Sequence, residues 1–306
     1  MGMMHFADTS RGRPFAKDPA VVRFGGRYLL YYTIAPYGDG RAGDGYAMGI
    51  AVSDDLDRWE TIGAILPDPA APYEANGLCA PGALVCAGRV HLFYQTYGNG
   101  PRDVLCHAIS TDGLSFARAA TNPIFAPTGD WNNGRAIDAD VLAHGDTLFL
   151  YFATRDPAGQ RQLLGVATAP LASDFGRAAW TQRCDAPILA PELPWEQECI
   201  EAPALCRRGD TLYMFYAGAY NNRPQQIGCA MSADGLRWQR LSDAPFLANG
   251  APGDWNASES GHPFLFTDDD GRTHLFFQGN NDGGRTWTLS RVEVGWDERG
   301  PHPLPE

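Results

Sequence analysis

Apolar and polar residues alternate along most of the chain in short runs that glycine-containing turns separate. Five segments share one pattern: a short polar or proline-containing opener, two to four apolar residues, a turn and an aromatic strand. They read DPAVVRFGGRYLLYYT, APGALVCAGRVHLFYQT, DADVLAHGDTLFLYFAT, EAPALCRRGDTLYMFYAG and GHPFLFTDDDGRTHLFFQG, beginning at Asp18, Ala80, Asp138, Glu201 and Gly261. Alternation on both sides of a tight turn predicts a β-hairpin in each segment.

The five openers recur at nearly constant spacing. Successive openers lie 62, 58, 63 and 60 residues apart. A repeat of this length with about four strands per unit is typical of a propeller blade. We therefore predict an all-β fold, a five-bladed β-propeller with about four antiparallel strands per blade, in which residues 1–306 form a single catalytic domain. The alternative is a two-sheet sandwich whose turns are evenly spaced by coincidence.

A second repeated motif, which begins with serine, indicates the remaining strands of the units. The sequences SDDL, STDGL and SADGL begin at Ser53, Ser110 and Ser232, and each follows an apolar strand and precedes another short one. Acids inside such motifs are usually turn residues. We expect this role for Asp54, Asp112 and Asp234.

Three openers begin with a carboxylic acid: Asp18, Asp138 and Glu201. The first strand of each propeller blade starts near the central axis, so these residues come together at the mouth of one channel. Inverting glycosidases need one ionised carboxylate to deprotonate water and one protonated acid for the departing oxygen. We predict that Asp18 activates water, that Glu201 donates the proton, and that Asp138 keeps Glu201 protonated and oriented.

Composition narrows the class of partner. The formal net charge of −12 repels phosphate backbones and anionic membrane surfaces, so we expect neither nucleic acid nor membrane as a partner. The aromatic fraction of 11% can supply surfaces that stack on sugars, which suits a small oligosaccharide substrate. The oligomeric state is left open by the sequence.

The cysteines and the first residues bear on localisation. Seven scattered cysteines without a CxxC pair argue against a zinc site and suit a reducing compartment. Residues 1–14 have no apolar run of the kind found in signal peptides. We therefore expect a cytoplasmic protein, although an exported protein with its signal removed would look the same.

The openers resemble those of glycoside hydrolase family 43, whose members are five-bladed propellers, along nearly the whole chain. Asp18-Pro19 looks like the family's general base, and Asp138, in AIDADV, corresponds to the aspartate that modulates the pKa of the acid. Glu201, in IEAPAL, is similar to the Glu-Gly-Pro motif of the general acid, with Ala202 in place of glycine. The resemblance implies an inverting, exo-acting hydrolase that releases a terminal furanose or pentose, of the α-L-arabinofuranosidase or β-D-xylosidase type.

Four further residues are candidates for substrate binding. His262, in SGHPFLF, matches a family histidine that commonly lies in the axial channel near a bound calcium or water. The resemblance therefore implies a structural calcium in the channel, contacted by His262 through water, and no cofactor for the chemistry. Arg285 is a candidate contact of the substrate or of Asp138. Trp131 and Arg135 are candidates for stacking on a sugar and binding its hydroxyls, although one tryptophan per blade is also typical of packing.

Two other functions remain open. A related propeller family that acts on neoagaro-oligosaccharides uses a histidine as general acid, so His262 is the alternative proton donor for an algal oligosaccharide or another furanoside. A non-catalytic sugar-binding propeller is the second alternative, and the intact acid trio argues against it. We assign the acid to Glu201 because it takes the same opener position as Asp18 and Asp138, whereas His262 is displaced by one residue.

Basic residues near the openers are scarce. A phosphorylase would need a cluster of them at the axis to bind phosphate, and no opener supplies one. Lys17 is the only lysine among 24 basic residues and directly precedes Asp18. Strand alternation predicts that neighbouring side chains point to opposite faces, so Lys17 should point away from Asp18.

Overall fold

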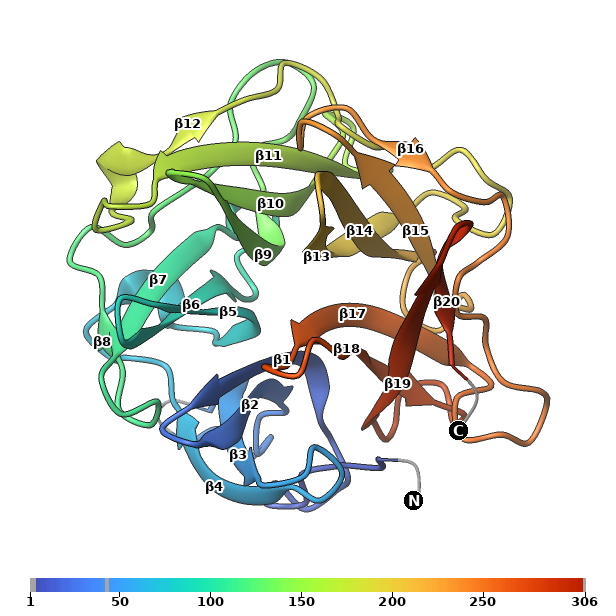
Figure 1. Ribbon diagram of the computed structural model, residues 1–306. Helices are drawn as coiled ribbons and strands as arrows, with labels where there is room; N and C mark the ends of the chain where they lie inside the picture. The colour runs from blue at the N-terminus through green and yellow to red at the C-terminus, as the bar shows by residue number, and fades with distance from the viewer. Residues whose placement is uncertain (1–3, 42–43, 305–306) are drawn as a thin grey trace.

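Five four-stranded antiparallel sheets surround a central axis in the computed structural model, which describes residues 4–41 and 44–304 (Figure 1). In each sheet the strands follow one another in chain order, with the first strand nearest the axis. This arrangement confirms the predicted fold class, an all-β five-bladed propeller with four antiparallel strands per blade.

The strands of the five blades have the following bounds. Blade one contains β1 (Lys17–Phe24), β2 (Arg27–Ile34), β3 (Ala47–Ser53) and β4 (Glu60–Ile65), and blade two contains β5 (Leu78–Cys86), β6 (Arg89–Thr96), β7 (Leu105–Ser110) and β8 (Ala117–Arg118). Blade three contains β9 (Ile137–His144), β10 (Thr147–Arg155), β11 (Gln162–Pro170) and β12 (Thr181–Gln182). Blade four contains β13 (Ile200–Arg208), β14 (Thr211–Gly218), β15 (Gln226–Ser232) and β16 (Gln239–Arg240). Blade five contains β17 (Glu259–Thr267), β18 (Thr273–Asn280), β19 (Thr288–Asp297) and β20 (Gly300–Pro303).

Three short 3-10 turns connect strands: η1 (Pro72–Glu74), η2 (Gly100–Arg102) and η3 (Arg177–Ala179). No helix in the described part of the chain has the length and apolar character needed to cross a membrane.

The second strand of every blade is buried on both faces because neighbouring sheets stack face to face. Its aromatic residues fill the space between blades, and Tyr32, Tyr94 and Tyr216 are almost completely buried. Their hydroxyl groups need partners there. Tyr94 donates to Glu74 at 2.6 Å, and Tyr216 donates to Glu196 at 2.7 Å. The core therefore lies between the blades, and the axis is left to the ends of the innermost strands.

The repeated serine motifs form turns, as predicted for two of the three acids. The Oδ1 atom of Asp112 accepts hydrogen bonds from the backbone nitrogens of Leu114 and Ser115, and Asp234 accepts an equivalent pair. In blade one this position is taken by Asp55 and not by the predicted Asp54, because in all three segments the acid that accepts these bonds lies two residues after the serine.

The first and last blades lie side by side and close the ring (Figure 1). The segment before β1 pairs with β19: the backbone nitrogen of Phe6 donates to the carbonyl of Leu289 at 2.9 Å, and that of Ala16 to Trp287 at 3.1 Å. These bonds tie residues nearly the whole chain length apart and hold the start of β1 at the axis.

Candidate active site

Each innermost strand contains a bulge at the axis. The pairing register between the first and second strands shifts there in all five blades. At the bulge one residue takes a backbone φ between 45° and 52°, a region that L-residues rarely adopt. These residues are Asp18, Ala80, Asp138, Ala202 and His262.

The bulges show that the predicted alignment of the five first strands is wrong in blades four and five. His262, not Glu201, takes the structural position of Asp18 and Asp138. Glu201 precedes the bulged residue of its blade, as Lys17 precedes Asp18. The argument that favoured Glu201 over His262 by register is therefore wrong, and the assignment has to rest on contacts.

Side chains from the neighbouring blade fix the bulges in blades one and three. The backbone nitrogen of Asp18 donates to Oε1 of Gln278 at 2.9 Å, and that of Asp138 donates to Oε1 of Gln95 at 2.7 Å. Both glutamines lie on the second strand of the preceding blade. The strained backbone is thereby held in place, as is common at functional sites.

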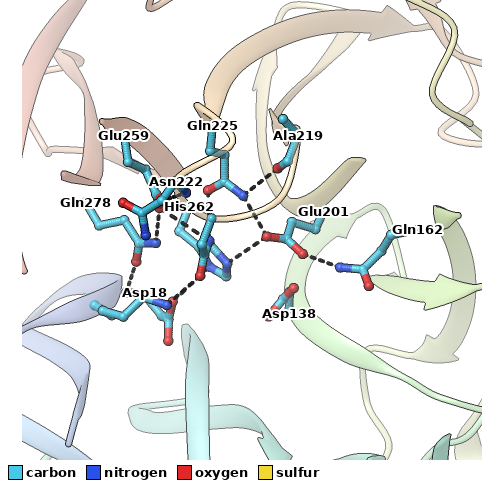
Figure 2. Close-up of polar contacts among 12 residues, drawn as sticks. Asp18, Asp138, Gln162, Glu201, Ala219, Asn222, Gln225, Glu259, His262 and Gln278 are labelled. Atoms are coloured by element: carbon cyan, nitrogen blue, oxygen red, sulfur yellow. Dashed lines mark hydrogen bonds and ion pairs between the residues drawn. The ribbon is translucent and has the colours of Figure 1, made fainter. Parts of the chain in front are cut away.

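The three predicted carboxylates line one cavity of about 490 Å³ at the axis. His262 lies between two of them (Figure 2). Its Nδ1 atom is 3.0 Å from Oδ1 of Asp18, and its Nε2 atom is 3.5 Å from Oε1 of Glu201. One imidazole ring thus spans the gap between the Asp18 and Glu201 carboxyl groups. This is compatible with the about 6.5–9.5 Å that separates acid and base in inverting glycosidases.

Two glutamines hold Glu201. Gln225 donates from Nε2 to Oε1 of Glu201 at 2.7 Å and to the carbonyl of Ala219 at 2.8 Å. Gln162 donates from its Nε2 atom to the other carboxylate oxygen (Figure 2). Glu201 is therefore fixed by residues of blades three and four.

The charges around the cavity keep Asp18 ionised. Burial alone would raise the pKa of Asp18, but the positive charges of His262 and Lys17 lower it well below its ordinary value. Burial would likewise lower the pKa of His262, yet Asp18 and Asp138 raise it well above its ordinary value. Asp18 and His262 consequently form an ion pair at neutral pH.

Asp138 and Glu201 differ in how tightly they bind a proton. Burial, helped by the negative charges of Glu201 and Asp18, raises the pKa of Asp138 to about 7. Burial would also raise the pKa of Glu201, but the hydrogen bond and charge of His262 and the bond from Gln225 lower it. The sequence predicted a raised pKa for Glu201. Asp138 therefore binds a proton more tightly than Glu201 does.

Asp138, Glu201 and His262 could hold a metal ion, since each places one ligand atom within 4.8 Å of the others. Calcium, which the resemblance implies, takes roughly six to eight oxygen ligands. This group offers two carboxylates and one imidazole nitrogen, a ligand more typical of transition metals. The donor set fits calcium poorly, and no step below passes through a metal ion.

The predicted substrate-binding residues divide into two groups. His262 and Arg135 line the cavity, and a terminal nitrogen of Arg135 lies 3.5 Å from Asp103. Trp131 instead packs against Phe152 and over Gly165, where a Cβ atom would meet both rings. Arg285 is exposed, and among the described residues it is not part of the cavity lining. The tryptophan follows the packing role that its repetition also suggested.

Several residues of the site escaped the sequence analysis. Tyr46, Gln162, Gln225 and Trp287 each stand at or just before the start of the third strand of their blade, facing the axis. The sequence does contain a signal for them. Each is followed, three residues later, by a buried glycine or serine of the third strand. The pattern differs in residue type from blade to blade, so no single motif marks it.

The cavity also contains more basic residues than the openers indicated. Arg13, Lys17, Arg135 and Arg155 line it. Because the bulge interrupts alternation, Lys17 faces the cavity beside Asp18 and does not point away from it. Its Nζ atom lies 4.4 Å from the centre of the Trp287 ring and 2.9 Å from Oδ1 of Asn221. The expectation that no basic cluster reaches the axis is wrong.

Comparisons with solved structures agree with the fold. A thermostable family-43 glycoside hydrolase superposes with a TM-score of 0.77 at 20% identity, covering 98% of this chain and 96% of that one. An endo-1,4-beta-xylanase of Bacteroides thetaiotaomicron gives 0.72 at 21% identity, with 95% and 94% covered. An alpha-L-arabinofuranosidase of Lactobacillus brevis gives 0.69 at 16% identity, with 94% of each chain covered.

Two curated relatives come from Thermoanaerobacter sp. (strain X514). A 1,2-beta-oligomannan phosphorylase is 26% identical over 215 residues, which cover 66% of this chain and 64% of the relative. A beta-1,2-mannobiose phosphorylase is 27% identical over 134 residues, covering 39% and 42%. The chain therefore spans less than two thirds of the length of the curated relatives it matches.

The family model described as glycosyl hydrolases family 43 matches residues 12–300. That range includes β1 to β19 and all the residues that line the cavity. The chain belongs to glycosyl hydrolase family 43.

Proposed function

We propose that the protein is an inverting, exo-acting glycoside hydrolase that releases a terminal furanose or pentose from a small oligosaccharide. The arabinofuranosidase or xylosidase type is the one the family resemblance favours. The observation that carries the proposal is the convergence of Asp18, Asp138 and Glu201 in one cavity. His262 and Lys17 lower the pKa of Asp18, whereas burial raises the pKa of Asp138 to about 7. Residues of all five blades surround this cavity, which favours entry of a chain end over passage of a polymer.

In the proposed reaction Asp18 takes a proton from water as the water attacks the anomeric carbon. Glu201 gives a proton to the glycosidic oxygen that departs, so the sugar is released with inverted configuration. Glu201 must be protonated when it acts. Burial raises the pKa of Asp138 to about 7, and a carboxylate oxygen of Asp138 lies within 4.8 Å of one of Glu201. We infer that Asp138 supplies Glu201 with this proton.

His262 is the alternative acid of the neoagaro-type mechanism. Both of its ring nitrogens face protein carboxylates, Asp18 on one side and Glu201 on the other. Neither nitrogen is then free to protonate a substrate oxygen. This contact argument, in place of the register, supports His262 as a positioning residue and Glu201 as the acid.

Phosphorolysis of a mannoside is a second candidate, favoured by the two phosphorylase relatives and by the basic residues of the cavity. In such a reaction phosphate takes the place of water. The ionised Asp18 would repel a phosphate ion on that side of the sugar, whereas hydrolysis requires this carboxylate. Hydrolysis is therefore the first candidate.

A panel of aryl glycosides separates these reactions. Nitrophenyl α-L-arabinofuranoside, β-D-xyloside and β-D-mannoside are incubated with and without phosphate, and the products are followed by NMR. We expect free sugar with inverted anomeric configuration in phosphate-free buffer. Sugar 1-phosphate formed only in the presence of phosphate would overturn the proposal in favour of phosphorolysis.

The role of Glu201 is tested by changing the leaving group. Glu201→Gln should slow hydrolysis of unactivated disaccharides by about 10²–10⁴-fold yet largely spare substrates with an activated phenol, which departs without a proton. Glu192→Gln, which alters an exposed carboxylate with a side chain 71% accessible, is the matched control. Equal slowing of both substrate types in Glu201→Gln would remove Glu201 from the role of acid.

A further inference from the structure

The cavity lining is rich in basic residues, although the protein as a whole is negatively charged. The chain carries a formal net charge of −12, yet the lining holds four arginine and lysine side chains against three carboxylates. Lys17 is held by Oδ1 of Asn221 at 2.9 Å and by the ring of Trp287. The remaining positive charge comes from arginines around the chemistry, so the lining favours an anionic ligand.

Arg155 is held in place by one end of its guanidinium group. It is the last residue of β10, and its Nε atom donates to Oε1 of Gln162 at 3.2 Å. The guanidinium carbon lies 5.6 Å from the centre of the Tyr220 ring. Among the described residues no carboxylate forms an ion pair with Arg155, so its two terminal amino groups remain free to bind a ligand.

Arg135 adds a second guanidinium on the same blade. Its Nε atom is buried and has no hydrogen-bond partner among the described residues, and its only ion pair is the 3.5 Å contact with Asp103. The backbone of Asn133 donates to the carbonyl of Arg155 at 3.0 Å, which holds the two arginine-bearing segments together. The two arginines line the same cavity, and each keeps guanidinium donors that no described residue accepts from, which suits a group with several acceptor oxygens.

Gln162 connects Arg155 to Glu201, the proposed general acid. Gln162 accepts from Arg155 through Oε1 and donates through Nε2 to Glu201 (Figure 2 shows the second contact). In the proposed function Glu201 protonates the departing oxygen, so Arg155 stands on the leaving-group side of the scissile bond.

We propose that Arg135 and Arg155 form an anion-binding subsite for the leaving-group portion of the substrate. The oligosaccharide that this enzyme shortens then carries a carboxylate, sulfate or phosphate substituent next to the sugar it releases. The placement on the leaving-group side rests on the proposed function, whereas the existence of the subsite rests on the arginines alone.

Calorimetry with the full chain tests the subsite. The probes are glucuronate, glucose 6-sulfate and inorganic phosphate, with glucose as the neutral control. We expect at least one anion to bind more tightly than glucose, and more weakly as salt is added. Arg155→Gln should weaken that binding by at least about tenfold, since charge-assisted hydrogen bonds are lost. Arg135→Gln is the second variant and should weaken it in the same direction.

Arg161→Gln is the matched control. Arg161 lies six residues beyond Arg155, but it pairs with Glu198 at 3.3 Å and is absent from the described cavity lining. Unchanged anion binding in this variant supports the subsite. Equal loss in Arg161→Gln, or binding of all three anions no tighter than that of glucose, would overturn the proposal.

The anion that binds best identifies the source of the charge. Tighter binding of glucuronate or of the sulfate ester supports a substituent on the substrate. Phosphate binding accompanied by sugar 1-phosphate formation would overturn the leaving-group placement, because the anion would then be the nucleophile. Since calorimetry needs no turnover, anion binding without hydrolysis of any glycoside would refute the proposed function and leave the subsite standing.

Discussion

Glu259 is a fourth buried carboxylate at the site, and the proposed chemistry does not use it. Its Oε1 atom accepts a hydrogen bond from Gln278 at 2.6 Å, and its Oε2 atom accepts one from the backbone of Asn222 at 2.7 Å (Figure 2). The side chain is inaccessible to solvent. Burial raises the pKa of Glu259 from its ordinary 4.5 to about 7, although Lys17 and these hydrogen bonds oppose the rise.

A raised carboxyl pKa means that the folded protein binds the proton more tightly than the unfolded chain does. The free energy of unfolding therefore falls as pH rises from about 4.5, where the unfolded chain loses the proton, to about 7. Each pKa unit corresponds to about 1.4 kcal/mol, so this group lowers stability by about 3 kcal/mol across that window.

The variant Glu259→Gln removes the ionisation and keeps the shape of the side chain. An amide cannot accept all the bonds that the carboxylate accepts, which adds a cost of about 1–3 kcal/mol that does not depend on pH. The difference in stability between variant and wild type should nevertheless shift in favour of the variant by about 3 kcal/mol between pH 4.5 and pH 8.

Urea unfolding of both proteins at several pH values measures this shift. Glu298→Gln, which alters an exposed glutamate in the turn between β19 and β20, is the control. A stability difference between Glu259→Gln and wild type that stays constant from pH 4.5 to pH 8 would refute the reasoning. So would an equal shift in the control variant.

Two further outcomes follow from the arrangement of the acids. Asp18→Asn should slow hydrolysis of activated and unactivated glycosides by similar factors, because water must be deprotonated whichever group departs; steady-state rates on a nitrophenyl glycoside and a disaccharide check this, and a loss confined to the disaccharide would contradict it. His262→Ala should lower kcat and remove the charge that lowers the pKa of Asp18, so the rising limb of the pH profile moves to higher pH. The falling limb should remain. Its disappearance would make His262 the acid.

The fold could be predicted because its signal repeats. Five hairpins at nearly constant spacing cannot bury their apolar faces singly, and a ring of stacked blades buries all of them. The predicted convergence of Asp18, Asp138 and Glu201 followed from that geometry, because first strands begin at the axis. Residues such as Gln162 and Gln225 could not be predicted in the same way. They hold Glu201 from the third strands, where the residue type changes from blade to blade.

The difference in proton affinity between Asp138 and Glu201 could not be predicted from the sequence either. It depends on the contacts that His262 and Gln225 make with Glu201. Those contacts come from His262 in blade five and from Gln225, just before β15, and no opener encodes them. Only the requirement for one ionised and one protonated carboxylate could be stated in advance.

Glu201 was wrongly aligned with Asp18 and Asp138 because the openers were aligned on their acids. The sequence contains a pattern that gives the correct alignment. A proline follows the bulged residue in four blades, as Pro19, Pro81, Pro203 and Pro263. Proline lacks an N–H group, so within a strand it is confined to positions such as a bulge, where ladder pairing is already broken. Aligning the openers on these prolines instead of on their acids puts His262 in line with Asp18.

The bulge also explains how so many charged groups reach one cavity. In a regular strand only every second side chain faces the axis, so each blade would contribute one residue at its inner end. At the bulge the residue of positive φ and the residue before it both line the cavity in blades one, two and three, for example Lys17 with Asp18. The interruption therefore allows a lysine to stand beside the proposed base. The charges of His262 and of this lysine together lower the pKa of Asp18.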